Sequence, residues 1–133
     1  MEQTVINNSP QKGDFRDLEI WKRCRDIRWK IWELTKVFPT EEKYRLVDQI
    51  IRASRSSTAN IAEGYGRFHF QENIQFCRQA RGSLCELIDH LLVAEECKYV
   101  EKERAEELLA EIKEGIIMLN GYIKYLKSRK EAL

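Results

Sequence analysis

The 133-residue chain predicts an all-α fold, an antiparallel up-down-up-down four-helix bundle. Three observations support this prediction. Apolar side chains recur three or four residues apart along most of the chain, which is the period of an α-helix. Only 2 prolines and 6 glycines are present, too few for the many turns of a β-sandwich or barrel. Apolar residues make up 43% of the chain, which excludes a disordered composition, and the length suits a single domain.

The first predicted helix follows a polar segment without periodicity, residues 1–13, which predicts a disordered tail ahead of a bundle domain over 14–133. Asp14 or Asp17 can cap this helix. Pro39 ends it, because the proline ring excludes the preceding residue from helical geometry. The residues that share one stripe of the helix, and that we expect in the core, are Ile20, Cys24, Ile27, Ile31, Leu34 and Phe38.

The second predicted helix begins after Thr40, which can cap it, and ends near Gly64 and Gly66, which indicate a helix stop. Its expected stripe is Tyr44, Val47, Ile51, Ser54, Thr58, Ile61 and Tyr65. Gly64-Tyr65-Gly66 resembles part of a phosphate-binding loop. No strand precedes it, however, which favours glycines at a helix C-terminus.

The third and fourth predicted helices follow a loop at about 66–70 and are separated near 97–100. Neither glycine nor proline lies in 97–100, so the pattern alone does not exclude one continuous helix there. The third stripe is Phe76, Cys77, Ala80, Leu84, Leu87, Ile88, Leu91 and Ala94, and the fourth is Ala105, Leu108, Ile112, Ile116, Leu119, Ile123 and Leu126. Similar helix lengths and short connections favour antiparallel neighbours.

Several classes of protein find no support in the sequence. No apolar run approaches the roughly 18 residues of a membrane span. The first residues lack the basic-then-apolar order of a signal peptide, so we expect a cytoplasmic protein with no membrane partner. The four cysteines occur singly, with no CxxC motif, which is typical of reduced, small core residues.

Catalytic and metal-binding motifs are also missing, so we expect no catalytic residue, no metal and no cofactor. The chain has only two histidines, His69 and His90, and neither has a glutamate three residues before it, as a di-iron bundle requires. HExxH and P-loop motifs do not occur. We expect His90 at the bundle edge, His69 exposed to solvent, and the thiol of Cys85 buried between helices rather than acting as a nucleophile.

Charge is distributed unevenly, although the net charge is only +1. The first 70 residues carry 13 basic and 10 acidic side chains, and basic residues are most concentrated in 15–36. Basic residues would meet phosphates, and Trp29 could stack on an unpaired base. The candidate nucleic-acid-binding residues, which lie off the apolar stripes, are Lys22, Arg25, Trp29, Arg52, Arg55, Arg78 and Arg81. The alternative is that these charges only solvate the bundle and that Trp29 lies in a subunit interface.

A line of small residues on the second and third helices predicts a tight packing seam. Glycine inside a helix destabilises it by about 1 kcal/mol relative to alanine, so Gly82 indicates a close approach of two helices. We expect Asn60 and Ser83 to form a hydrogen bond across this seam. Glu63, one turn further on, could accept a hydrogen bond or pair with Arg81.

The segment from Ser57 to Arg67, STANIAEGYGR, resembles the central signature of the bacterial four helix bundle protein family, also known as the proteins encoded by 23S rRNA intervening sequences. Further similar segments are Phe15-Arg16-Asp17-Leu18 with Trp21, Phe38-Pro39 with Glu42, and Ala80-Arg81-Gly82-Ser83-Leu84 with Glu86-Leu87. The resemblance covers about residues 15–127. It places Asn60, Glu63, Gly64, Arg67, Gly82 and Ser83 in a helix-packing signature. Thr58 departs from the pattern, since many members have proline there.

The resemblance implies an antiparallel bundle that assembles into a homopentamer. It extends to the accessory variability determinant of diversity-generating retroelements, a basic pentamer that binds nucleic acid and a reverse transcriptase. We therefore expect a non-enzymatic oligomer that binds nucleic acid, RNA more readily than DNA, with a reverse transcriptase or another protein as a further partner. The alternative is a structural or adaptor protein that docks another protein, because Trp21, Trp29 and Trp32 cannot all face one core.

Overall fold

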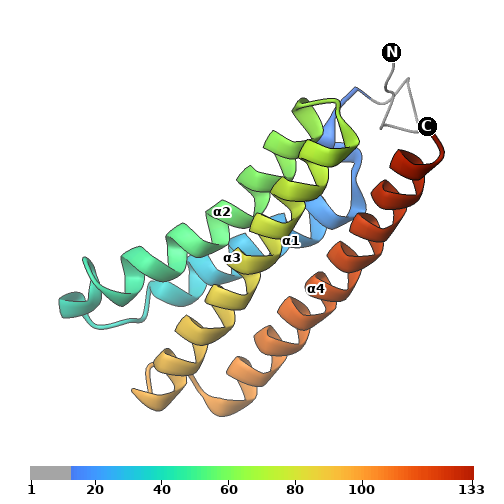
Figure 1. The fold of residues 1–133 in the computed structure, drawn as a ribbon. Helices are drawn as coiled ribbons and strands as arrows, with labels where there is room; N and C mark the ends of the chain where they lie inside the picture. Colours follow the sequence, from blue (N-terminus) through green and yellow to red (C-terminus); the bar gives the residue numbers. More distant parts are fainter. Residues whose placement is uncertain (1–12) are drawn as a thin grey trace.

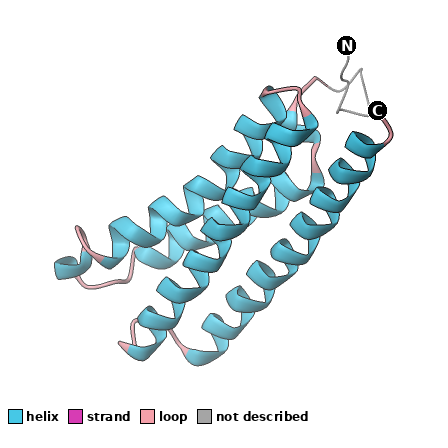
Figure 2. Cartoon of the chain, in the orientation of Figure 1, coloured by secondary structure: helices cyan, strands magenta, loops and turns pink. Residues whose placement is uncertain are grey.

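The computed structural model describes residues 13–133, so the predicted tail over 1–13 lies almost entirely outside the described residues. Four helices make up most of the described chain: α1 (Glu19–Thr35), α2 (Leu46–Gly66), α3 (Phe70–Glu96) and α4 (Lys102–Glu131). Two short 3-10 helices, η1 (Phe15–Asp17) and η2 (Thr40–Glu42), precede α1 and α2 (Figure 1). No strand occurs within residues 13–133, which confirms the all-α class (Figure 2).

The four helices pack as a bundle in which each helix contacts two neighbours. Helices adjacent in sequence lie side by side, α4 returns to α1, and α2–α3 is the most extensive pairing. Within the described chain, the diagonal pairs α1/α3 and α2/α4 have no Cα atoms within 8 Å of each other. The α1–α2 connection and the α3–α4 turn lie at one end of the bundle, and the α2–α3 turn lies at the other (Figure 1). The predicted four-helix bundle is therefore confirmed.

Most of the predicted core positions are buried. The largest fully buried side chains come from all four helices and are Ile27, Ile31, Ile50, Ile61, Ile74, Leu84, Leu87, Leu91, Leu108, Ile112, Leu119 and Leu126. Tyr44 was expected in this core, and that expectation is wrong, because Tyr44 precedes α2 and is 83% exposed. Burial of these aliphatic side chains supplies the main driving force for the fold.

The capping residues act differently from the prediction. Asp14 caps η1, where its carboxylate accepts a hydrogen bond from the backbone N–H of Arg16 at 2.8 Å. α1 ends at Thr35, three residues before the buried Phe38. Thr40 opens η2, so the expectation that it caps the second long helix is wrong. η2 therefore lies between the buried Phe38 and the start of α2 at Leu46.

Helices α2 and α3 approach each other closely at Gly64. A Cβ atom built on it would lie 2.7 Å from the Asn73 Oδ1 atom and 2.9 Å from the Phe76 Cβ atom. A Cβ atom on Gly82 would meet nothing within 4 Å, and Gly82 is exposed. The predicted role of Gly82 in the seam is therefore wrong, because its position on α3 faces solvent. The predicted end of the second helix near Gly64 and Gly66 is confirmed, since α2 ends at Gly66, although the cap is Arg67 and the positive φ that follows is carried by Phe68, at 59°.

The α2–α3 seam is polar as well as tight, but its hydrogen bonds differ from the prediction. Asn60 does not bond Ser83 directly. Its Nδ2 atom donates to the Ser56 carbonyl oxygen at 2.9 Å and to the Ser56 Oγ atom at 3.0 Å. The Ser56 and Ser83 hydroxyls are 2.8 Å apart. Ser56 therefore links Asn60 to α3, a role that spacing alone did not reveal.

Of the two roles considered for Glu63, acceptance of a hydrogen bond is confirmed and pairing with Arg81 is wrong. Glu63 pairs within its own helix with Arg67, at 3.1 Å. Arg81 turns toward α4, where its Nη1 atom donates to the Asn120 Oδ1 atom at 2.7 Å. Glu63 therefore pairs within α2, and Arg81 bonds across to α4.

The cysteines divide into two classes. Cys24 and Cys77 are buried, and desolvation raises their thiol pKa values to about 11 and about 12. Cys85 and Cys97 are exposed, so the expectation that all four lie in the core is wrong for these two. Cys97 follows the end of α3, and the positive φ of Lys98, at 64°, breaks the helix there without glycine.

Candidate nucleic-acid interface

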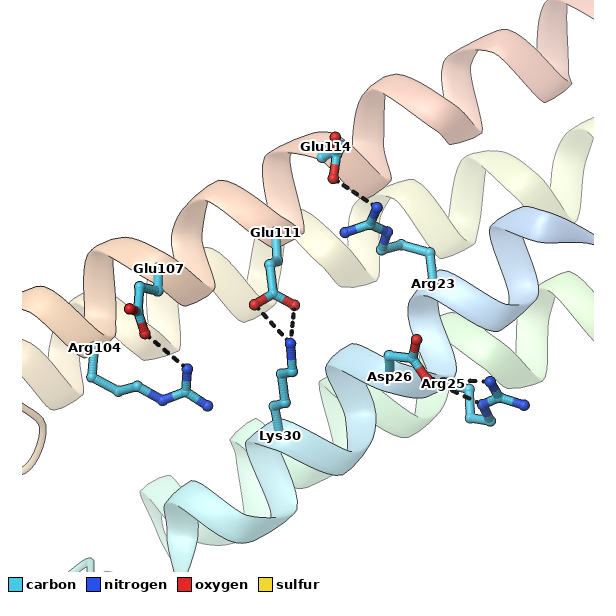
Figure 3. A network of polar contacts seen from close by, with 8 residues as sticks. All are labelled: Arg23, Arg25, Asp26, Lys30, Arg104, Glu107, Glu111 and Glu114. Atoms are coloured by element: carbon cyan, nitrogen blue, oxygen red, sulfur yellow. Dashed lines mark hydrogen bonds and ion pairs between the residues drawn. The ribbon is translucent and has the colours of Figure 1, made fainter.

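The basic side chains that face α4 are neutralised by carboxylates. The Arg23 Nη2 atom lies 2.7 Å from the Glu114 Oε1 atom, and the Lys30 Nζ atom lies 2.7 Å from the Glu111 Oε1 atom. Figure 3 shows both ion pairs crossing the gap between the two helices. These pairs cross the α1–α4 seam, and each places a carboxylate beside a basic side chain of α1.

The opposite side of α1, which packs against α2, has a different character. A groove of about 340 Å³ lies between the two helices. Its lining combines exposed indoles, guanidinium groups and a small apolar wall: Arg28, Trp29, Trp32, Ile51, Ser54 and Arg55. Trp29 is 55% exposed and Trp32 39% exposed, unusually high for such large apolar side chains. We refer to these six residues as the α1–α2 groove.

Within residues 13–133, the two arginines of the groove have no carboxylate partner. The Arg28 Nη1 atom donates a hydrogen bond to the Thr58 Oγ1 atom at 2.9 Å. The Arg55 guanidinium lies over the Trp32 ring, 5.8 Å from its centroid. Among the residues that the structure describes, neither arginine is within 4 Å of a carboxylate oxygen. The groove is therefore a site of unneutralised positive charge beside aromatic surface, which is suited to anionic aromatic ligands.

A second aromatic cluster extends this surface toward η1. Trp21 packs edge-on against Phe15, with ring centroids 5.4 Å apart. The guanidiniums of Arg25 and Arg28 lie 5.5 Å and 6.0 Å from the centroid of Trp21. Arg25 also approaches the carboxylate of Asp26 at 3.3 Å, so its charge is partly compensated. Arg28 thus connects the two tryptophan clusters.

The structure does not bring the seven predicted nucleic-acid-binding residues onto one surface. Trp29 and Arg55 line the α1–α2 groove, and Arg25 is linked to it through Trp21. Two of the other four are paired with a carboxylate on their own helix: Lys22 with Glu19 at 3.3 Å and Arg52 with Asp48 at 3.6 Å. The last two lie on α3, where Arg78 is exposed and Arg81 bonds Asn120 of α4. Because α3 lies diagonally across from α1, the predicted set is spread around the bundle.

Sequence reasoning missed Arg28 as a binding residue and treated Trp32 only as a possible interface residue. One signal was present in the sequence. Arg28 and Trp32 are four residues apart, so they share one side of α1 beside Trp29. Ile51 was expected in the core and instead lies half-buried at the edge of the groove. Only the packing of α2 against α1 shows that these residues face one another.

The described residues contain no cluster that resembles a metal centre. No group of three or more histidine, cysteine, aspartate or glutamate side chains within residues 13–133 could hold a metal ion. His90 lies at the bundle edge with its Nε2 atom 3.0 Å from the Glu86 Oε2 atom, and His69 is exposed, both as expected. No helix in this part of the chain is sufficiently long and apolar to span a bilayer.

Fold and site together define a four-helix bundle protein with an arginine- and tryptophan-lined groove between its first two helices. Residues 16–121 match the model of the 23S rRNA-intervening sequence protein family, and the chain belongs to that family. The expected family membership is thereby confirmed.

Comparison with solved structures supports the same fold. A crystal structure of a protein of unknown function from the S23 ribosomal protein family, from Bacteroides thetaiotaomicron VPI-5482, superposes with a TM-score of 0.73. The two chains are 23% identical, and the alignment covers 79% of this chain and 95% of the other. A search of curated proteins found no match.

Proposed function

We propose that this protein is a non-enzymatic, oligomeric helical bundle that binds nucleic acid, RNA in preference to DNA, through the α1–α2 face. The observation that supports the proposal is the pair Arg28 and Arg55, which have no carboxylate partner among the described residues and flank two exposed tryptophans. Arginine suits phosphate because its planar guanidinium donates several hydrogen bonds and is weakly hydrated. Tryptophan suits single-stranded nucleic acid because every base has a face that can stack on it.

The preference for RNA follows from the availability of unpaired bases. Structured RNA presents loops and bulges whose bases are free to stack on aromatic side chains, whereas duplex DNA does not.

We further propose a cyclic homo-oligomer, with a pentamer as the expected size. Two sets of exposed apolar side chains are available for self-contact. One is Trp29 with Trp32, and the other is Leu92 with Val93 near the C-terminal end of α3, which are 39% and 36% exposed. Ile117 on α4, which is 70% exposed, is a further apolar side chain outside the groove. Contact through the second set would leave the α1–α2 groove open and present several copies of it. Several weak sites on one assembly would then combine into useful avidity.

An electrophoretic shift with structured RNA, repeated over a series of salt concentrations, tests the nucleic-acid proposal. Binding should weaken steeply with salt, because release of condensed counterions supplies much of its free energy. The double variant Arg52→Gln/Arg55→Gln should bind RNA more weakly and show a flatter salt dependence, with the bundle still folded by circular dichroism. If the wild-type protein shows no salt-sensitive shift with RNA or DNA at low ionic strength, the proposal is wrong.

The second candidate function is that of an adaptor that docks another protein. The exposure of Trp29 and Trp32 favours it, because aromatic side chains are frequent anchors of protein interfaces. This function would require no salt-dependent RNA binding. A negative result in the shift assay would therefore support it, and a reverse transcriptase gene beside this one would support the nucleic-acid function.

A further inference from the structure

We propose that the α1–α2 groove holds one unpaired nucleotide of a single strand, with its base against Trp29 and Trp32 and the phosphates on either side of that base at Arg28 and Arg55. This inference rests on the proposed nucleic-acid function and adds the class of ligand: single-stranded rather than duplex RNA. Four observations support it, namely the size of the groove, the composition of its wall, the placement of its charges and the fixed position of one arginine.

The groove has the dimensions of a small-ligand site. Its volume of about 340 Å³ falls at the lower end of the range, roughly 300–1,000 Å³, that small-molecule pockets occupy. A single nucleotide is a ligand of this scale, whereas an intact duplex is not. A base inside a duplex is also stacked on both faces, so it has no free face to offer the indoles.

The wall of the groove is apolar where a base would lie. Trp29 and Trp32 come from α1, and Ile51 comes from α2 across from them. Ser54 is 2% exposed, and its hydroxyl donates to the Ile51 carbonyl oxygen at 2.8 Å, so its hydrogen is already used. The wall therefore offers stacking and apolar contact and little hydrogen-bond readout. We expect weak discrimination among the four bases.

Both charges line the groove, Arg28 from α1 and Arg55 from α2, so the phosphates of a strand lying in it would meet positive charge. Arg28 is held in position by Thr58, whose hydroxyl donates to the Arg55 carbonyl oxygen at 3.1 Å and accepts from Arg28 at 2.9 Å. A side chain that is already oriented loses less conformational entropy on binding than a free one. Arg55 rests on the Trp32 ring, beside the surface that would receive the base. Charge and stacking surface are thus adjacent, as they are in a nucleotide.

The chain offers a matched control for the charge at Arg55. Arg52 lies three residues earlier on α2, is also exposed, and pairs with Asp48, but it does not line the groove. Arg52→Gln and Arg55→Gln remove the same charge from the same helix. Any difference between them therefore reports the groove rather than the overall charge.

The experiment measures fluorescence anisotropy of two labelled RNAs, a decamer of uridine and a blunt, fully paired duplex, at low and moderate salt. We expect Arg55→Gln to weaken binding of the decamer more than Arg52→Gln does. It should also lower the salt slope by about 0.7, because one phosphate of the single strand is no longer neutralised by the protein. We expect Trp29→Ala to weaken decamer binding about five- to 150-fold and to leave duplex binding unchanged.

A measurement on the wild-type protein supports the proposal without any variant. Stacking of a base on Trp29 or Trp32 should quench tryptophan emission when the unlabelled uridine decamer is added, and the duplex should quench it much less. This readout remains available if Trp29→Ala does not fold. Absence of quenching at saturating decamer would overturn the proposal.

The inference and the proposed function can fail separately. If RNA binds in a salt-dependent manner but Arg55→Gln equals Arg52→Gln and Trp29→Ala has no effect, the groove assignment is wrong and the proposed function stands. If neither RNA binds the wild-type protein, both are wrong. If a decamer of glutamate displaces the uridine decamer equally well from wild type and from Trp29→Ala, the strand is held by charge without stacking on Trp29, which also overturns the inference.

Discussion

Replacement of each of two helical glycines, Gly64 and Gly82, by alanine gives a direct test of how α2 packs on α3. Gly64 and Gly82 both lie within helices, so each alanine should gain about 1 kcal/mol of helix propensity. At Gly82 a Cβ atom meets nothing within 4 Å, and we expect Gly82→Ala to stabilise the protein by about that amount. At Gly64 the same atom would lie 2.9 Å or less from two atoms of α3, a separation at which one of the helices must move.

The atoms that oppose a side chain at position 64 are not free to move. The Phe76 Cβ atom is fixed to the α3 backbone. Asn73 is fully buried, its Nδ2 atom donates to the Tyr122 hydroxyl at 3.3 Å, and its Oδ1 atom accepts from the Cys77 thiol at 3.5 Å. Overpacking of such a site destabilises a protein by about 1–3 kcal/mol. The propensity gain is common to both variants, so this overpacking energy is the expected difference between them.

Urea denaturation followed by circular dichroism at 222 nm measures both variants against wild type. We expect the midpoint of Gly82→Ala to rise and that of Gly64→Ala to fall below it by an amount equivalent to about 1–3 kcal/mol. Gly121, which also has open space around it, offers a second control on α4. Equal midpoints for Gly64→Ala and Gly82→Ala would refute the close approach at Gly64.

Three further predictions follow from burial and exposure. Cys85 and Cys97 should react at once with a thiol reagent at pH 8, whereas Cys24 and Cys77 should react only on unfolding, and a count of four fast thiols would contradict this. Burial raises the pKa of the Cys24 thiol from 9.0 to about 11 and that of the Cys77 thiol from 9.0 to about 12. Their contribution to the free energy of unfolding is therefore complete below pH 9 and is lost as the pH rises toward the pKa values of the folded state. The expected loss is about 1.4 kcal/mol per thiol at pH 10. Replacement of both by alanine should flatten the measured stability between pH 8.5 and 10.5. Sedimentation equilibrium at micromolar concentration should give an oligomer, and a monomer would contradict the proposed assembly.

The groove and the self-association proposals compete for two of the tryptophans. If the oligomer buries Trp29 and Trp32, their emission should not respond to RNA. If the contact uses Leu92 with Val93, the groove stays open in every protomer. Sedimentation of a Leu92→Glu variant distinguishes the two, because a charge in a self-contact should dissociate the oligomer whereas a charge on a free surface should not.

Local periodicity was sufficient to predict which faces of the helices are buried. Ile27, Leu87 and Ile112 each lie on a stripe that their own spacing indicates, and all three are fully buried. The reason is that burial of a helix face depends on the order of apolar residues along that one helix. The turn near residue 97 was also correctly placed, although the residue that breaks the helix, Lys98, carries no sequence signal for a positive φ.

Pairing between helices was not predictable in the same way. Glycine at positions 64 and 82 is the same residue in the same kind of helix, and only the rotation of α2 and α3 against each other puts one in the seam and the other in solvent. Arg52 and Arg55 also look alike in sequence, yet only Arg55 faces α1. Relative rotation depends on side chains from two helices at once, so no single-helix pattern contains it.

The sequence by itself therefore determined the four helices, their buried stripes and the signature segment Ser57–Arg67 of the 23S rRNA-intervening sequence protein family, because each depends on residues close together along the chain. The tertiary structure alone decided that Arg28, Trp32 and Arg55 form one groove and that Arg23 and Lys30 are neutralised on the other side of α1. Basic residues on one helix look alike in sequence. Their charge becomes available or is cancelled according to which carboxylates the neighbouring helix brings within a few ångströms.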